Sequence, residues 1–149
     1  NAERLTWDKF YPVCAPGYKV NLGDIDQHRL FYCTAMMTTW DTWAEDQMIC
    51  RRPKITHCQV LGTALAAAES GAGLAMAHDC TAKHLIDNGR LIRPFSHAVT
   101  MPEAYYLTLN PYTERNQQAR WFADWIKDEM SDDYSWVDGT QAYPFSHKI

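Results

Sequence analysis

Long apolar runs are absent from this 149-residue sequence, and so is a basic stretch followed by an apolar one at its start. A membrane-spanning helix needs about 20 consecutive apolar residues, and a signal peptide needs the basic-then-apolar order. We therefore expect neither a membrane anchor nor an export signal. An excess of positive charge is also lacking, because the formal net charge is -4. This charge argues against binding of nucleic-acid phosphates by this part of the protein.

Closely spaced cysteine pairs are missing as well. The sequence has five cysteines, an odd number, and none of them forms a C-x-x-C motif. Such wide, irregular spacing fits neither a secreted disulfide framework nor a structural zinc site. It fits reduced thiols, most of them small buried side chains, in a cytoplasmic protein without metal or other cofactor. The cysteines are Cys14, Cys33, Cys50, Cys58 and Cys80.

Apolar and aromatic residues are plentiful, and their spacing alternates between strand and helix periods. The length suits one domain with a single core, and the order of elements predicts an α/β fold. The predicted strands are Leu5–Cys14, Arg29–Thr34, Lys54–Val60, Gly73–Ala77, Leu91–Ile92 and Ala104–Leu109. The predicted helices are Trp40 to about Met48, Gly62–Glu69, Thr81–Asn88 and Asn116–Met130, with a loop or short helical turn at 21–27.

Two of these segments carry more specific expectations. In the stretch 64–77, small helix-forming residues precede a glycine turn and a short apolar strand, which predicts the second half of a β-α-β unit. Gly71 stands where a left-handed helix end is needed. In the last helix, the spacing predicts an apolar face, which comprises Ala119, Phe122, Trp125, Ile126 and Met130.

Several motifs occur in one order along the chain: WDKFYPVCAP, HRLFYCTAMMTTWDTWAED, AAAESGAGLAMA, GRLIRPF, AYYLTLN and RWFADWIKDEM. This order resembles the effector-binding domain of LysR-type bacterial transcriptional regulators. Within that family, it is most similar to the glycine-cleavage-activator and β-lactamase-activator branch. The resemblance covers Leu5 to Met130. The sequence departs from the family pattern at Ala77–Asp79, where a Leu-Pro is usual.

The resemblance implies a type II periplasmic-binding-protein-like fold, of which this chain holds a truncated part. We expect a partial effector-binding domain at 3–130, with a nearly complete second subdomain at about 13–75, the rest belonging to the first subdomain, and a C-terminal extension at 131–149. The implied function is sensing of a small, possibly anionic, metabolite in a cleft between subdomains. The implied partners are this effector, further copies of the chain in a homo-oligomer, and DNA only through an N-terminal winged helix-turn-helix missing here.

The effector-binding candidates lie at two predicted helix starts and on one strand. Backbone N–H groups at a helix start bind anions well, because the unpaired donors and the helix dipole both attract negative charge. Tyr105 matches a cleft-facing tyrosine of the β-lactamase-activator branch. That branch also places an acid and a serine where this chain has Gln59 to Leu61, so its ligand chemistry does not transfer. The candidates are Gln59, Gly62, Thr63, Thr38, Thr39 and Tyr105.

Four other functions compete with effector binding. His78, Asp79, Cys80 and His84 are close in sequence, but a closed metal site needs about four ligands in one set. Cys80 and His84 could instead form a thiol nucleophile and its base in a hydrolase or thiol-dependent enzyme, although no nucleophile motif surrounds them. A solute-binding protein of a transporter would share the fold. We expect no catalytic residues, and oxidant sensing by Cys33, Cys50 or Cys58 stays open.

Overall fold

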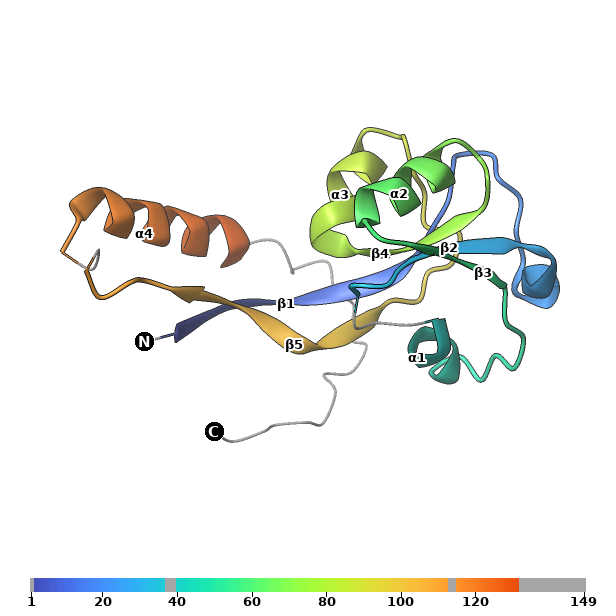
Figure 1. Ribbon diagram of the computed structural model, residues 1–149, viewed down its shortest axis with the longest axis horizontal. Coiled ribbons are helices and arrows are strands. Elements are labelled where there is room, and N and C mark those ends of the chain that lie inside the picture. Colours follow the sequence, from blue (N-terminus) through green and yellow to red (C-terminus); the bar gives the residue numbers. More distant parts are fainter. Residues whose placement is uncertain (1, 37–39, 113–114, 132–149) are drawn as a thin grey trace. The chain divides into compact units, whose positions relative to one another are not determined.

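The computed structural model describes residues 2–36, 40–112 and 115–131, and it contains one sheet with helices (Figure 1). Thr38, Thr39 and the expected extension beyond Ser131 lie outside these residues. The strands are β1 (Ala2–Val13), β2 (Arg29–Cys33), β3 (Lys54–Cys58), β4 (Leu74–His78) and β5 (Val99–Thr108). The helices are the 3-10 helix η1 (Leu22–Gln27) and α1 (Trp40–Glu45), α2 (Leu61–Glu69), α3 (Asp79–Asp87) and α4 (Gln117–Ser131).

The five strands form a mixed sheet in the order β3-β2-β4-β1-β5. Strand β2 is parallel to both β3 and β4, whereas β1 is antiparallel to β4. The chain thus passes from β3 through α2 to β4. Strands β3 and β4 lie on opposite sides of β2 in the sheet. This is the β-α-β unit predicted from the small residues at 64–77, and the α/β class is confirmed. The antiparallel pairing of β1 with β4 makes the sheet mixed.

The chain divides into two compact units. One unit comprises the chain up to Asp8 and from Thr100 onward, and the other comprises Lys9–Val99. Both β1 and β5 contribute residues to each unit.

In the unit Lys9–Val99, α2 and α3 lie on one face of the sheet and α1 lies on the other (Figure 1). Where α2 lies against β4, the buried side chains on this face are small. Ala75 and Ala77 of β4 are fully buried there, together with Ala64 and Ala68 of α2. Alanines on both surfaces let the helix backbone approach the strands closely, which explains why this segment is so poor in large side chains.

The opposite face is filled by large side chains around Trp43 of α1. Its ring is fully buried and lies 5.0 Å from that of Trp40 and 5.5 Å from that of Phe95, measured between centroids. The indole N–H of Trp43 donates a hydrogen bond to the carbonyl of His97 at 3.1 Å. This bond satisfies the one polar atom of the buried ring, so the tryptophan is accommodated without an orphaned donor.

The elements α1 and β5 and the predicted strand at 91–92 differ most from the sequence-based predictions. The helix predicted at 40–48 ends at Glu45, because the chain reverses through Met48 in a left-handed conformation with φ of 50°. Strand β5 begins at Val99, before the predicted start at Ala104, and therefore contains Pro102. A proline is tolerated at the edge of a sheet, and β5 is a terminal strand in the sheet order. In place of a strand at 91–92, Ile92 forms a single bridge with Cys14.

Helix α4 buries only part of its predicted apolar face, since Ala119, Ile126 and Met130 are partly buried. Ala123 is its buried residue, whereas Phe122 and Trp125 are each 55% exposed. The prediction of a buried aromatic face was therefore wrong at these two positions. The two rings contact each other, with centroids 5.6 Å apart.

Two glycines just before β4 stand at positions where the backbone requires a residue without a Cβ atom. Gly71 adopts φ of 83°, as predicted for the end of α2. Gly73 has an ordinary φ, but a Cβ atom added there would lie only 2.3 Å from the carbonyl oxygen of Arg29 in the neighbouring strand. Such an approach is far inside van der Waals contact, and the obstacle is backbone, which cannot rotate away.

We expect Gly73→Ala to lower the free energy of unfolding by about 1 to 3 kcal/mol, the usual cost of overpacking. The matched control is Gly62→Ala, since an added Cβ at Gly62 meets no atom within 4 Å. That change lies inside α2 and should leave stability unchanged or raise it by up to about 1 kcal/mol. Urea unfolding at equilibrium measures both variants. Equal stabilities of the two variants would contradict the packing argument.

Candidate functional site

The turn from β3 into α2 brings three of the predicted residues together. Gln59 follows the end of β3, and the helix begins at Leu61, earlier than the expected start at Gly62. Gly62 and Thr63 therefore lie within the first helical turn, and both are exposed, as is Gln59. The turn follows the carboxyl ends of the parallel strands β2 and β3, where α/β sheets commonly bind ligands.

The start of α2 has no side-chain cap. Its N-cap residue, Val60, has no polar side-chain atom, and no side-chain hydrogen bond caps the helix. The N–H of Thr63 donates to the carbonyl of Val60 at 3.1 Å, which leaves the N–H groups of the two preceding residues as the usual orphan donors of a helix start. This end of the helix therefore presents donors and a partial positive charge to solvent.

Contacts from β2 hold the same turn in place. The thiol of Cys33 lies 3.7 Å from the carbonyl oxygen of Gln59 and donates to it. The backbone N–H of Thr34 donates to the carbonyl of Cys58 at 3.0 Å. The end of β2 thus fixes the last residue of β3 and the first residue of the turn.

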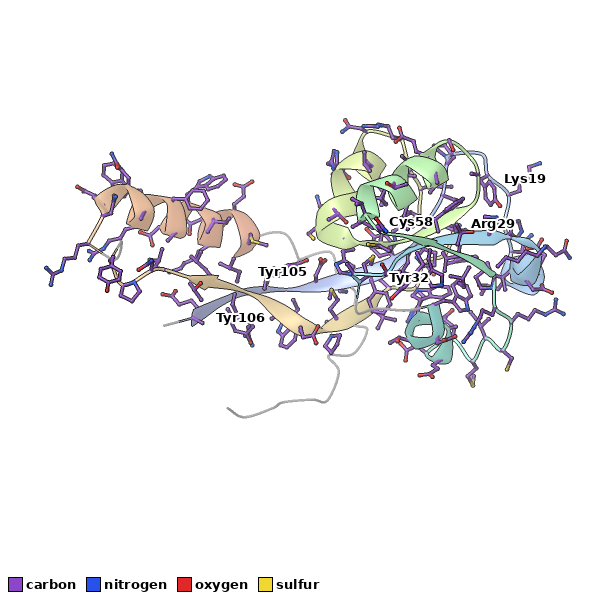
Figure 2. All side chains as sticks on the ribbon, viewed as in Figure 1. Lys19, Arg29, Tyr32, Cys58, Tyr105 and Tyr106 are labelled. Carbon is purple, nitrogen blue, oxygen red and sulfur yellow. The ribbon has the colours of Figure 1, made fainter. Side chains whose placement is uncertain are left out.

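Tyr105 belongs to β5 in the other unit. Its hydroxyl donates to Oδ2 of the fully buried Asp8 at 3.2 Å. Tyr105 is 39% exposed, whereas the following Tyr106 is 55% exposed. The two side chains project to opposite sides of the strand, as alternation predicts (Figure 2).

A polar cluster that was not predicted lies at the end of η1. His28 contacts the Tyr18 hydroxyl through Nδ1 at 2.8 Å and Oδ1 of Asp24 through Nε2 at 3.1 Å. Burial, followed by the nearby Cys14 and Asp24, raises the pKa of Tyr18. The cluster joins two ends of one loop, and no periodic sequence signal could have indicated it.

The His-Asp-Cys segment considered for metal binding is divided between buried and exposed positions. Asp79 is buried at the start of α3, and its Oδ1 accepts a hydrogen bond from the Tyr11 hydroxyl at 2.5 Å. Cys80 and His84 are exposed on α3. Within the ranges that the structure describes, no three or more His, Cys, Asp or Glu side chains are arranged to hold a metal ion. The described part of the chain also contains no helix long and apolar enough to cross a membrane.

Comparison with known proteins identifies the family of this domain. The sequence matches the LysR substrate binding domain family over residues 1–131. The chain belongs to this family. Domains of the LysR substrate-binding family bind small-molecule effectors in regulators that are typically oligomeric and contact DNA through a separate N-terminal domain. The family recognised from the motifs is confirmed, and such domains are generally not enzymes.

Solved structures with the same fold include other LysR-type domains. The effector domain of AmpR from Pseudomonas aeruginosa has a TM-score of 0.71 at 20% identity and is covered over 65% of its length by 87% of this chain. The AmpR effector binding domain from Citrobacter freundii has a TM-score of 0.62 at 21% identity, with 68% of it and 88% of this chain covered. The regulatory domain of CrgA, a LysR-type regulator from Neisseria meningitidis, has a TM-score of 0.59 at 16% identity, with 68% and 87% covered.

This LysR-type domain thus spans about two thirds of each of these structures. The presence of AmpR domains among them agrees with the β-lactamase-activator branch recognised in the sequence. Among curated proteins, no sequence matches this chain.

The bond between Tyr105 and Asp8 gives a first test of the site. We expect Tyr105→Phe to lower the free energy of unfolding by about 1 kcal/mol, because a buried carboxylate loses a donor. Tyr106→Phe, one residue further along the same strand, is the control and should leave stability unchanged. Thermal or urea unfolding measures both. A loss of equal size in the two variants would show that the hydroxyl of Tyr105 is not specifically engaged.

The cluster around His28 gives a test of pH dependence. The hydrogen bond from the backbone N–H of Asn21, followed by the His28 interactions, holds the pKa of Asp24 below its ordinary value of 3.8. A carboxyl group with a lowered pKa stabilises the folded state above its unfolded-state pKa, and this stabilisation is lost as the pH falls through the folded-state pKa.

Asp24→Asn should therefore reduce stability at neutral pH, and its difference from the unchanged protein should shrink as the pH falls below 3.8. Urea midpoints measured over a series of pH values test this expectation. A difference that stays constant down to the acid limit would contradict it.

Proposed function

We propose that this LysR-type domain binds a small anionic metabolite at the amino-terminal end of α2. The contacts are the backbone N–H of Gly62, the hydroxyl of Thr63 and the amide side chain of Gln59. The observation that carries the proposal is the exposed, uncapped first turn of α2 at the carboxyl ends of two parallel strands. Orphan donors and the helix dipole both favour a carboxylate or phosphate there.

Thr38 and Thr39 remain candidate contacts of this effector, and Tyr105, which belongs to the other unit, remains a separate effector-binding candidate. The first two follow β2, the strand that precedes β3 in the sequence and pairs with it. Tyr105 is supported by its match to the family tyrosine. Its exposed ring offers an apolar surface, while its own hydroxyl is hydrogen-bonded to Asp8. Effector binding, not catalysis, is the role of all these residues.

The domain is the regulatory part of a longer transcription regulator. Residues 3–130 form a partial effector-binding domain, with about 13–75 as its second subdomain and 131–149 as an extension. Effector binding biases the packing of one protomer against another, and the free energy available is the effector's differential affinity for the two arrangements. DNA is contacted by a winged helix-turn-helix encoded elsewhere in the gene, and the protein works in the cytoplasm, where its operator DNA is.

A panel of metabolites scored by thermal shift tests the proposal. Each carboxylate or phosphate is paired with a neutral analogue of similar size. A true effector present at 100 times its Kd adds about 2.7 kcal/mol to the free energy of unfolding, which raises Tm measurably. Stabilisation by the neutral analogues alone would contradict an anion site.

For the best anion, we expect Thr63→Val to weaken binding by about tenfold or more, the loss of one hydrogen bond to a charged group. The control is Ser70→Ala, because Ser70 is an exposed hydroxyl at the opposite end of the same helix. Titration calorimetry gives the two Kd values. Equal affinities of the two variants would place the site away from the start of α2.

A further inference from the structure

Two cysteines are neighbours across the β2–β3 strand pair. In the parallel register, Cys33 stands opposite Cys58. Neighbouring strands lie about 4.8 Å apart, and the Cα atoms of disulfide-bonded cysteines lie about 4.4 to 6.8 Å apart. Both cysteines are thiols in this structure. The backbone already provides the separation that a disulfide needs.

The two thiols also share one face of the sheet. Alternation places Cys33 on the same face as Arg29, and Cys58 on the same face as Thr56. Nη1 of Arg29 donates to Oγ1 of Thr56 at 2.7 Å, which confirms that these two sets of side chains face the same way. Cys58 packs against the apolar cluster formed with α2 and α3, so the pair lies on the helix-covered side.

We propose that Cys33 and Cys58 form a reversible disulfide when the protein meets a peroxide. The thiolate of Cys58 attacks one peroxide oxygen, the O–O bond breaks, and Cys58 becomes a sulfenic acid while hydroxide leaves and takes up a proton. The thiolate of Cys33 then attacks the sulfenic sulfur, and the S–O bond breaks with loss of a second hydroxide, which is also protonated. In total, two thiols and one hydrogen peroxide give one disulfide and two waters.

The order of the two steps follows from burial. Cys58 is half-buried, whereas Cys33 is 3% exposed, so peroxide reaches Cys58 first. Cys14 is a natural contrast, because it is fully buried and burial raises its pKa to about 11.

Oxidation would also change the turn that leads into α2. The Cys33 thiol donates to the carbonyl of Gln59, and a disulfide sulfur has no hydrogen to donate. The turn therefore loses one of its contacts with β2 in the oxidised form. A consequence for effector binding rests on the proposed function. The formation of the disulfide does not depend on the proposed function.

The disulfide is tested by peptide mapping without reductant. Between positions 33 and 50, and again between 58 and 80, the sequence has no Lys or Arg, so trypsin leaves each of the two cysteines in a peptide with another cysteine. The full chain is therefore used with the exposed Cys50 and Cys80 replaced by serine. It is treated with hydrogen peroxide, alkylated after unfolding, and digested.

We expect the two peptides to be joined, Cys14 to be alkylated, and dithiothreitol to restore both thiols. Cys33→Ser in the same background should abolish the link and leave Cys58 as a sulfenic acid that dimedone traps. Alkylation of both Cys33 and Cys58 after peroxide treatment, or oxidation of Cys58 to sulfinic acid without a link, would overturn the proposal.

The effect on the turn is measured by hydrogen exchange of the backbone amides at 59–63. Exchange should be faster in the disulfide form than in the reduced form and should return with dithiothreitol. Unchanged exchange in a protein shown to carry the disulfide would overturn the coupling to the turn. Failure of the metabolite panel, in contrast, would affect the effector proposal and leave this measurement valid.

Discussion

The close approach of α2 to the strands beneath it is the constraint on which the second unit depends. Ala64 and Ala68 on the helix meet Ala75 and Ala77 on β4, and Gly73 lies against the carbonyl of Arg29. The four alanines are fully buried, and at Gly73 no larger side chain fits without a movement of the backbone. Because α2 packs so closely on β4, this packing sets the position of its first turn relative to the ends of β2 and β3. The geometry of the candidate effector site is therefore a consequence of packing several residues away.

Much of this architecture is local and could be predicted. The period of apolar residues, the run of alanines and the left-handed Gly71 lie within a few residues of the structures they determine. The β-α-β unit was predicted for this reason. The family motifs added the wider fold, since six short segments in order are specific where each alone is weak. Of the site, the exposure of Gln59, Gly62 and Thr63 follows from the same local pattern.

What the sequence could not provide is the outcome of contacts between distant segments. The inward face of α4 is set by what packs on Ala123, so the larger Phe122 and Trp125 were wrongly expected to be buried. The antiparallel pairing of β1 and the passage of β5 through Pro102 depend likewise on neighbours in the sheet. The register that sets Cys33 beside Cys58 is of the same kind. A shift of one residue would have turned the two thiols to opposite faces.

The short outer strand β3 has a consequence for solubility. Within the described residues it ends the sheet order, so one side of its backbone has no strand partner. Exposed edges of this kind invite pairing with a second chain and growth of fibrous aggregates. β3 is only five residues long, begins with the exposed Lys54 and directly follows Pro53, three features that limit such intermolecular pairing. The strand that carries Cys58 and leads into the candidate effector turn is thus protected against pairing with other copies of the chain.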